Sequence, residues 1–534
     1  MDPYEESKIK TERYKKLKKL LKIVYGYDCF RLKQYEIINR IINGEDVCAI
    51  MATGVGKSLC FQVPALYLDK PAIIVSPTIA LMNDQKNILS KLGIKSCCYN
   101  SNVSNKRDML MDILQFKYRI IYITPESIVN LKKFLLDLED KQGISLIAID
   151  EAHCISSYGF DFRKKYRELS FLKKYLPEVP ILAITATATP MVIKDICEVL
   201  GLECEKPIVT SFNRPNLYLE VRKKSSSIGR DIIPIIKKFR DSSIIIYCLT
   251  KRKTHEVADV LNAHGIISCV YHADLDIEER NKAHDDFIRG NIKIIIATIA
   301  FGMGINKPDV RVVIHYGAPK NIEGYYQEIG RAGRDGNSAY CYIFYGFQDF
   351  IIQEKLIRTN SDVNYRKVLL DLLEKMRLYL ISNKCRKQVL LEYFGEKMDD
   401  KCNFCDNCCN TEKKMVKENA DITSSMKKDA RMFINLVESI KNRHFGIKMC
   451  IKILKGVDDK NIPSDIKKSK FYGIGRNHSF AWWKRLAKKL IELEYLKYEF
   501  LDNSRFMQIK TTDKGTAWAN STELAELGLE VTGK

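Results

Sequence analysis

A glycine-rich loop between two apolar segments constrains the fold of this chain more than any other feature. Residues 51–58 read MATGVGKS; they follow the apolar run 47–51 and lead into a helical pattern. A strand, a glycine loop and a helix in this order place backbone N–H groups and the positive end of the helix dipole where they can bind phosphates. Lys57 is then expected to reach the β- and γ-phosphates of a nucleotide such as ATP, and the Ser58 hydroxyl to hold Mg²⁺. The predicted nucleotide-binding residues of the loop are Thr53, Gly54, Val55, Gly56, Lys57 and Ser58.

Met51 stands where the general motif has its first glycine, so a glycine-rich turn with an accidental Gly-Lys-Ser is the alternative. An acidic pair downstream argues for the nucleotide site: Asp150 and Glu151 follow the apolar run 144–149. A carboxylate at a strand end beside a phosphate loop can hold Mg²⁺ through water, and the next carboxylate can orient and deprotonate the attacking water. Alone, such a pair is equally typical of a solvated turn. The predicted catalytic residues here are Lys57, Asp150, Glu151 and His153.

The composition limits the partners and the environment of the chain. Its 534 residues suffice for three or four domains, and 46% of them are hydrophobic. No apolar run is as long as a membrane span requires, and the polar N-terminus lacks the pattern of a secretory signal, so we expect no membrane association. The 17 cysteines indicate reduced thiols in an intracellular compartment, nucleus or cytoplasm. The net charge of +21 favours nucleic acid as a partner; lysines that only aid solubility are the alternative.

Strand-like and helical segments alternate from residue 45 to 205 and again from 210 to 345. Such β/α alternation predicts parallel sheets covered by helices, here in two tandem lobes. The second lobe lacks a phosphate loop but contains the segment QEIGRAGRDG, with Gln327, Arg331 and Arg334 as predicted catalytic residues. The two arginines are expected on one helical face, from which they can cross a cleft and stabilise charge on the γ-phosphate. A surface helix with structural arginines is the alternative.

The residues before the phosphate loop carry a more specific pattern. The fixed positions of the motif L-x3-[FYW]-G-x3-F-R-x2-Q are occupied by Leu21, Tyr25, Gly26, Phe30, Arg31 and Gln34. With this motif, residues 21–345 resemble a superfamily 2 helicase and, within that group, the RecQ family. The resemblance implies that Gln34 reads the adenine edge while Tyr27 and Arg31 flank the ring. The chemistry agrees, because an amide can pair bidentately with adenine and guanidinium or phenol faces stack on bases.

Further segments match the family in order. Those that resemble strand-contact segments lie at residues 75–85, 122–126 and 271–275, and those that resemble segments coupling hydrolysis to lobe movement lie at 185–188 and 297–305. Their hydroxyls and backbone N–H groups suit contact with a nucleic-acid backbone.

An aromatic-rich loop after the acidic pair resembles the RecQ loop that senses single-stranded DNA and links it to hydrolysis. Aromatic side chains stack on bases without sequence preference. The family usually has tryptophan at the position of Tyr158 and histidine at that of Phe160, which bears on the strength of the coupling to DNA. Aromatics packed in the core are the alternative. The predicted DNA-contact residues of the loop are Tyr158, Phe160, Phe162 and Arg163.

A cysteine cluster follows the second lobe. Its members, spaced C-x16-C-x2-C-x2-C, are Cys385, Cys402, Cys405 and Cys408. Four thiolates with this spacing can converge on one tetrahedral Zn²⁺ and leave it no open position, so we expect a structural zinc site. A register shifted by one would use Cys409 in place of Cys408. The surrounding residues resemble the RecQ zinc-binding subdomain; free thiols or a redox-active pair are the alternatives.

The C-terminal region is strongly basic, with 14 Lys or Arg against 3 Asp or Glu in residues 441–490. A helical pattern followed by two strand-like runs predicts a winged helix, and residues 421–518 resemble the RecQ C-terminal domain, whose wing can wedge duplex ends apart. The candidate wedge residues are Phe500, Leu501 and Phe506. Packing inside the wing is the alternative for each of them.

The sequence therefore predicts an α/β fold of two tandem RecA-like parallel-sheet lobes, followed by a helical zinc-binding subdomain and a winged-helix domain. The expected limits are 1–208, 209–350, 351–412 and 413–519, with a C-terminal tail at 520–534. The resemblance implies an ATP-dependent 3′-to-5′ DNA helicase of recombination, repair or replication that uses ATP, Mg²⁺ and Zn²⁺. Its expected partners are DNA, as single-stranded tails and duplex junctions, and repair or replication proteins. The alternatives are an RNA helicase and a non-catalytic nucleic-acid scaffold.

Overall fold

The computed structural model describes residues 11–203, 206–302, 307–409, 424–440, 443, 445–493, 495–500 and 507–520. The chain forms two compact units, residues 1–411 and 412–534, each with its own hydrophobic core. Leu501, Phe506 and residues 303–305 of the predicted segments lie outside the described part. Among the described helices, none is both long and apolar enough to cross a membrane.

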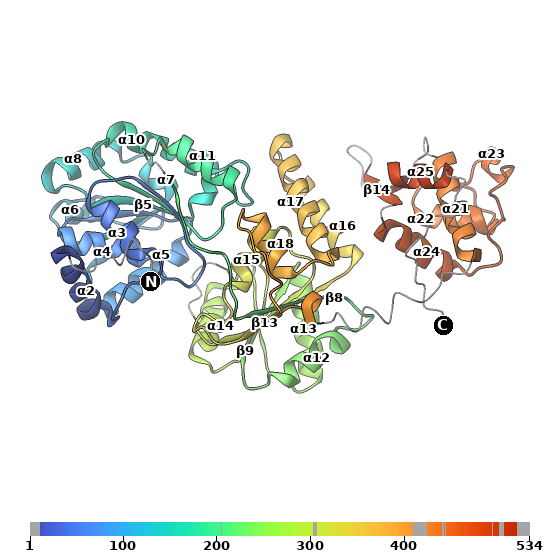
Figure 1. The fold of residues 1–534 in the computed structure, drawn as a ribbon, viewed down its shortest axis with the longest axis horizontal. Coiled ribbons are helices and arrows are strands. Elements are labelled where there is room, and N and C mark those ends of the chain that lie inside the picture. Colours follow the sequence, from blue (N-terminus) through green and yellow to red (C-terminus); the bar gives the residue numbers. More distant parts are fainter. Residues whose placement is uncertain are drawn as a thin grey trace. The chain divides into compact units, whose positions relative to one another are not determined.

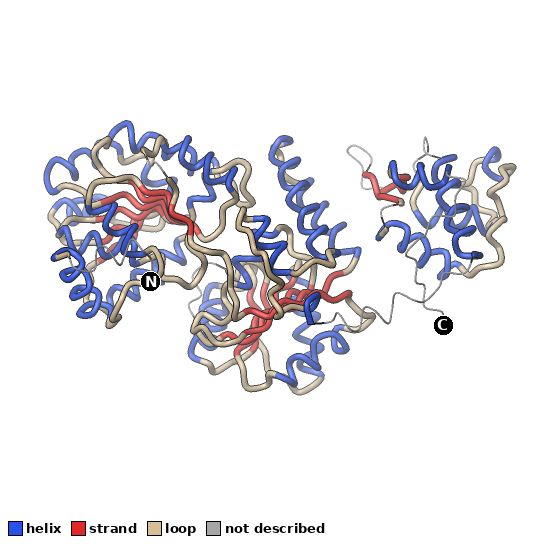
Figure 2. Tube along the Cα trace, in the orientation of Figure 1, coloured by secondary structure: helices blue, strands red, loops and turns tan. Residues whose placement is uncertain are grey.

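Lobe 1 is built on a seven-stranded sheet in the order β3-β4-β2-β5-β6-β1-β7, in which all neighbouring strands are parallel. Helices cover both faces, so the strands are short apolar runs buried on both sides (Figure 2). The strands are β1 (Val47–Ile50), β2 (Ala72–Val75), β3 (Ser96–Tyr99), β4 (Ile120–Ile123), β5 (Leu146–Asp150), β6 (Ile181–Thr185) and β7 (Ile208–Val209). The helices are α2 (Glu12–Tyr25), α3 (Gln34–Ile42), α4 (Leu59–Leu68), α5 (Ile79–Lys91), α6 (Lys106–Leu114), α7 (Pro125–Ile128), α8 (Lys132–Gln142), η1 (Ala152–Ile155), α9 (Lys164–Arg167), η2 (Glu168–Ser170), α10 (Phe171–Tyr175) and α11 (Pro190–Leu200).

Lobe 2 repeats this plan with a six-stranded parallel sheet in the order β10-β11-β9-β12-β13-β8. Helices α12 and α13 pack on one face, and α14 and α15 on the other. The strands are β8 (Leu217–Lys223), β9 (Ser243–Cys248), β10 (Cys269–Tyr271), β11 (Ile294–Ala297), β12 (Val310–Tyr316) and β13 (Ala339–Tyr345). The helices are α12 (Ile228–Lys238), α13 (Lys251–Ala263), α14 (Ile277–Arg289) and α15 (Ile322–Ile329). The two predicted parallel-sheet lobes are thus confirmed.

A group of helices completes the first unit: α16 (Phe347–Arg358), α17 (Val363–Ile381), α18 (Arg386–Tyr393) and α19 (Asp406–Cys409) (Figure 1). The connector between the lobes packs against this group, because Phe212 stacks on Phe394 with 4.4 Å between the ring centroids. Glu396 accepts a hydrogen bond of 2.7 Å from the Phe212 backbone N–H. The helices after lobe 2 therefore also fix the segment that joins the two lobes.

The second unit has the helices and the hairpin of a winged helix. Its elements are α21 (Ser424–Ser439), α22 (Ile447–Lys455), α23 (Ser464–Lys467), α24 (Phe480–Glu492), β14 (Leu496–Phe500), β15 (Met507–Thr511) and α25 (Asp513–Asn520). Trp483 of α24 is fully buried in the core and donates a 2.8 Å hydrogen bond to the Gly475 carbonyl. Strands β14 and β15 pair antiparallel, with Phe500 opposite Met507 at the end toward the wing tip. The tip itself lies outside the described residues, so the wedge assignments remain predictions.

The four predicted cysteines come together beside lobe 2. The Sγ atoms of Cys385, Cys402, Cys405 and Cys408 all lie within 4.8 Å of one another. Those of Cys402 and Cys408 are 3.8 Å apart, close to the roughly 3.8 Å that a tetrahedral ion with Zn–S bonds of about 2.3 Å requires. Cys409 is exposed and its thiol points to the Asn403 carbonyl, so the register that uses Cys408 is the one the structure supports. The donors fit one structural Zn²⁺.

Buried charges anchor this cluster to lobe 2. The Arg386 guanidinium donates to both carboxylate oxygens of Asp406, at 2.9 and 3.1 Å. Asp406 also accepts from the backbone N–H of Val221 in strand β8, at 3.0 Å. Burial opposes the Cys385 thiolate, but backbone N–H groups of Gln388 and Cys402 lower the pKa of that thiol to about 7. Burial raises the pKa of the Cys402 and Cys408 thiols, so the full set of thiolates depends on the charge of a bound cation.

Replacing a member of the cluster should remove the metal and destabilise residues 385–408, because metal binding contributes to their folding free energy. Metal analysis of the purified protein is expected to give one Zn²⁺ per chain, lost in Cys405→Ser and kept in the matched control Cys409→Ser. Zinc loss in Cys409→Ser with retention in Cys408→Ser would contradict the assigned register.

Candidate active site

The phosphate loop lies between the end of β1 and the start of α4, as the sequence predicts. Gly54 and Gly56 have φ angles of +87° and +86°, a conformation that favours glycine. A Cβ atom at Gly56 would also lie 2.7 Å from the Gln34 amide nitrogen. Both glycines are therefore required by the shape of the loop, although Met51 replaces the first glycine of the general motif.

The acidic pair at the end of β5 lies beside this loop. The Lys57 Nζ is 3.7 Å from the Glu151 Oε1. The other oxygen of Glu151 is 3.3 Å from His153 Nδ1 and accepts a 3.4 Å hydrogen bond from Thr185 at the end of β6. Parallel strands place their carboxyl ends at one edge of the sheet, which explains how residues from three segments meet here. The structure thus brings together Lys57, Asp150, Glu151 and His153.

The pKa values of the two adjacent carboxyl groups shift in opposite directions. Burial, followed by the charge of Glu151, raises the pKa of Asp150 to about 6. Burial also acts to raise the pKa of Glu151, but the Lys57 ammonium and the His153 ring more than offset it and hold that pKa well below its usual range. As long as Lys57 stays on Glu151, this carboxylate is a weak base.

Gln34 contacts the loop directly. Its Nε2 donates to the carbonyls of Val55 and Gly56 at 2.9 and 3.0 Å, and its Oε1 accepts from the Arg31 N–H at 2.8 Å. The side chain is buried, whereas Tyr27 is 48% exposed with the Arg31 guanidinium 5.7 Å from its ring centroid. The predicted base-contact residues therefore adjoin one another, and Gln34 joins them to the phosphate loop.

The prediction that Arg331 and Arg334 share a helical face is wrong. Helix α15 ends at Ile329, and both arginines lie in the following turn. Gly333 adopts a φ of +57°, which does not continue a right-handed helix, and a Cβ at Gly330 would lie 1.8 Å from the Thr53 hydroxyl oxygen. The turn approaches the phosphate loop so closely that residue 330 must be glycine, and the chain does not continue as a helix beyond it. We name residues 330–336 the arginine turn.

The turn nevertheless places its arginines at the loop. The Arg334 Cγ lies 3.2 Å from the position that a Cβ on Gly54 would take. Burial, followed by the charges of Arg331 and Arg214, lowers the pKa of Arg334 to about 10. From α15, Gln327 donates a 3.1 Å hydrogen bond to Thr187 of lobe 1. A cluster of guanidinium groups beside a phosphate loop is suited to bind an anion.

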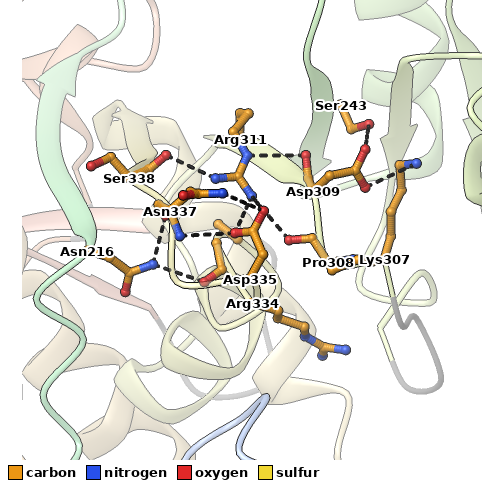
Figure 3. Close-up of polar contacts among 12 residues, drawn as sticks. Asn216, Ser243, Lys307, Pro308, Asp309, Arg311, Arg334, Asp335, Asn337 and Ser338 are labelled. Carbon is orange, nitrogen blue, oxygen red and sulfur yellow. Dashed lines mark hydrogen bonds and ion pairs between the residues drawn. The ribbon is translucent and has the colours of Figure 1, made fainter. Parts of the chain in front are cut away.

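Three residues that the sequence did not single out hold the arginine turn. Arg214 in the connector donates to the carbonyls of Ala332 and Gly333 at 2.9 and 3.0 Å, and reaches the Thr53 carbonyl at 3.4 Å. Asn216 donates to the carbonyls of Gly333 and Asn337, both at 2.9 Å. On the other side of the turn, Arg311 pairs with both oxygens of Asp335 at 2.7 Å (Figure 3). The only signal in the sequence was a short polar stretch, Asn213-Arg-Pro-Asn216, between two apolar runs.

The aromatic-rich loop extends from the acidic segment toward α17. Phe160 is buried and stacks on the His153 ring, with 4.7 Å between centroids, while Tyr158 is 45% exposed. The Tyr365 hydroxyl of α17 accepts from the Phe162 N–H at 3.0 Å and donates to the Gly159 carbonyl at 3.2 Å. In this structure Phe160 is therefore a core residue, and Tyr158 is an exposed aromatic of the loop.

Arg163 ends the aromatic-rich loop and joins it to the segment that follows β2. Its guanidinium donates to the Pro77 carbonyl at 2.8 Å and lies 3.3 Å from an Asp161 carboxylate oxygen. Pro77 belongs to the segment 75–85 that was predicted to contact a nucleic-acid strand. One predicted strand-contact segment and the aromatic-rich loop are thus adjacent in space.

Comparison with known proteins agrees with this architecture. Four family models match: DEAD/DEAH box helicase over residues 31–196, helicase conserved C-terminal domain over 228–336, RecQ zinc-binding over 347–409 and RQC domain over 419–532. Among solved structures, the DNA-bound helicase MrfA superposes with a TM-score of 0.52 at 18% identity, covering 73% of this chain and 59% of that one. The yeast protein Dbp5, bound to RNA and ADP BeF3, gives 0.51 at 19% identity, covering 67% and 99%. These two likenesses concern the fold.

Similar curated proteins share more of the sequence. A putative ATP-dependent RNA helicase of Acanthamoeba polyphaga mimivirus is 59% identical over 529 residues, which are 99% of this chain and 96% of the relative. The ATP-dependent DNA helicase RecQ of Haemophilus influenzae is 35% identical over 93% of this chain and 78% of the relative. The mouse exonuclease/helicase WRN is 36% identical over 96% of this chain, which spans 38% of that longer protein. With its lobes, cysteine cluster and C-terminal unit, the chain belongs to the RecQ family of superfamily 2 and is an ATP-dependent helicase.

Proposed function

We propose that this chain is a DNA helicase that moves 3′ to 5′ along one strand and serves recombination, repair or replication. The observation that carries the proposal is the succession, in one chain, of two lobes, a four-cysteine cluster and a basic winged-helix unit. Separating each base pair must offset stacking of roughly 1.4 kcal/mol per step, which ATP and a wedge can supply together. The division at residues 208, 350, 412 and 519 is part of the proposal. The ranges of the four matching families support the first three limits, whereas the RQC match continues past 519 to residue 532.

An RNA helicase is the second candidate, because the mimivirus relative is named a putative RNA helicase. A groove that grips phosphates does not by itself distinguish the two sugars. The Haemophilus relative is named a DNA helicase and supports the first candidate. As partners we propose single-stranded DNA tails and duplex junctions, together with proteins of repair or replication, in a reducing intracellular compartment.

In the proposed hydrolysis step, Lys57 leaves Glu151 and reaches the phosphates of ATP. Ser58 and Asp150 would hold Mg²⁺, which neutralises charge on the phosphates. Without Lys57 beside it, the pKa of Glu151 rises toward its usual range, so that its carboxylate can accept a proton from the attacking water. ATP binding would in this way switch on the base that its own hydrolysis needs.

Two further contacts support a coupling between hydrolysis and nucleic acid. Gln327 reaches Thr187 across the lobes, and Arg331 and Arg334 adjoin the phosphate loop, so lobe closure would present their charge to the γ-phosphate. On the other side, His153 joins Glu151 to the ring of Phe160 in the aromatic-rich loop. A base stacked on Tyr158 would shift this loop and, through His153, the catalytic acid.

Two substitutions test the hydrolytic roles. Lys57→Ala and Glu151→Gln should each abolish ATP hydrolysis, the first by removing the phosphate contact and the second by removing the base, while Glu151→Gln should still bind ATP. Steady-state ATPase assays and binding of a fluorescent nucleotide check both. Lys141→Ala, an exposed lysine of α8, is the matched control. Wild-type turnover in either site variant would refute the assignment.

A double-mutant cycle tests whether Arg214 acts by holding the arginine turn. Arg334→Ala should slow hydrolysis at least roughly tenfold with little change in ATP affinity. Arg214→Gln should slow hydrolysis about ten- to a hundredfold, since displacing a catalytic group such as Arg334 by about 1 Å has effects of that size. In the Arg334→Ala background, Arg214→Gln should have little additional effect, because the guanidinium that Arg214 helps to position is already absent. Additive losses in the ATPase rate would show that Arg214 acts by another route.

Matched forks of DNA and RNA with 3′ tails test the proposed substrate and direction. We expect unwinding of the 3′-tailed DNA fork and little on the RNA or 5′-tailed forks. Deleting residues 421–534 should reduce unwinding more than ATPase activity, and it should lower the salt dependence of duplex binding because the most basic segment is lost. Preferred unwinding of the RNA fork would select the second candidate.

A further inference from the structure

Three side chains of different chemistry converge between the catalytic acids and the aromatic-rich loop. The Cys154 Sγ lies 3.8 Å from His153 Nε2 and 3.7 Å from Asp161 Oδ2. All three atoms lie within 4.8 Å of one another. A tetrahedral Zn²⁺ with a sulfur at about 2.3 Å and nitrogen and oxygen at about 2.1 Å keeps such atoms about 3.5 Å apart. The two distances from the sulfur are therefore close to those that one bound ion requires.

The imidazole is already oriented for a metal. His153 Nδ1 is 2.8 Å from the Thr185 hydroxyl, which leaves Nε2 directed at the Cys154 thiol. Metal-binding histidines usually have their second ring nitrogen held by such a hydrogen bond. The ring of Phe160 stacks on the imidazole and restricts its rotation. The ligand with the strictest directional demand is thus fixed in advance.

The three side chains can be reached from a cavity, and one neighbouring charge competes with an ion for Asp161. His153 and Cys154 are buried, whereas Asp161 lines a cavity of 480 Å³ together with Phe160 and Phe162. An ion could enter from this cavity and take a water from it as fourth ligand, the arrangement of zinc sites with three protein ligands. Arg163 lies 3.3 Å from the same Asp161 oxygen and competes with an ion there, but its 2.8 Å hydrogen bond to Pro77 can persist when Asp161 turns away.

We propose that His153, Cys154 and Asp161 form a second Zn²⁺ site, separate from the four-cysteine cluster. On binding, the Cys154 thiol releases its proton to solvent as the zinc–sulfur bond forms. The ion joins the segment that follows the catalytic acids to the aromatic-rich loop and holds that loop in the conformation seen here. Occupation of the site therefore acts as a brake on nucleic-acid-stimulated hydrolysis. The brake rests on the proposed coupling through the loop; the metal site itself does not.

A cobalt titration tests the site without reference to activity. Co²⁺ is added to the full chain, with the four-cysteine cluster filled by Zn²⁺ and thiols kept reduced. The wild type should bind one further ion and develop a thiolate-to-cobalt charge-transfer band, lost in Cys154→Ala and retained in Cys341→Ala, an equally buried thiol of β13. Asp161→Asn should weaken binding by at least roughly tenfold. No further ion on the wild type, or an unchanged band in Cys154→Ala, would overturn the site.

ATPase assays with added Zn²⁺ test the brake. DNA-stimulated hydrolysis should fall in the wild type and in Cys341→Ala as the second ion binds, and should persist in Cys154→Ala. Zinc that merely replaces Mg²⁺ at the nucleotide would inhibit all three proteins alike, an outcome that overturns the brake. A different result is a wild type that binds the second ion in the cobalt titration but shows no DNA-stimulated hydrolysis in the absence of added Zn²⁺. That result would refute the proposed function and leave the metal site supported.

Discussion

Contacts to the backbone of residues 53–56 hold together parts of the chain that are far apart in sequence. The carbonyls of Val55 and Gly56 accept from Gln34, which lies before the loop, and the Thr53 carbonyl accepts from Arg214, which lies after the whole of lobe 1. The arginine turn approaches so closely that Gly330 has no room for a side chain beside Thr53. A change in the conformation of this loop therefore alters the surroundings of Gln34, of the connector and of lobe 2.

The same loop carries the lysine that affects the pKa values of both predicted catalytic acids. Lys57 pairs with Glu151 and depresses its pKa, while burial and the charge of Glu151 raise that of Asp150. A nucleotide that recruits Lys57 changes both environments at once, since the Coulombic contribution of Lys57 is among the causes of both shifts. In the proposed function, binding and activation are thus one event, and lobe 2 adds the arginine charge when the lobes close.

The chain sequence predicted those features that depend on local pattern. Apolar runs predicted the strands, the spacing of glycine and lysine predicted the phosphate loop, and the spacing of cysteines predicted the four-cysteine cluster. Each of these features is set by residues near one another in the chain. Contacts between distant segments could not be predicted this way. Arg331 and Arg334 have helical spacing, yet the approach to Thr53 requires a glycine turn. Arg214 bonds to backbone carbonyls, which any sequence supplies, and the burial of Phe160 depends on His153 and on packing across the loop.

The most direct test of this account is an experimental structure of the wild-type chain with a non-hydrolysable ATP analogue and a 3′-tailed DNA. In that complex we expect Lys57 Nζ to leave Glu151 for the phosphates and the Arg334 guanidinium to come within hydrogen-bond distance of the γ-phosphate. A complex in which Lys57 remains on Glu151, with the arginine turn directed away from the nucleotide, would contradict it.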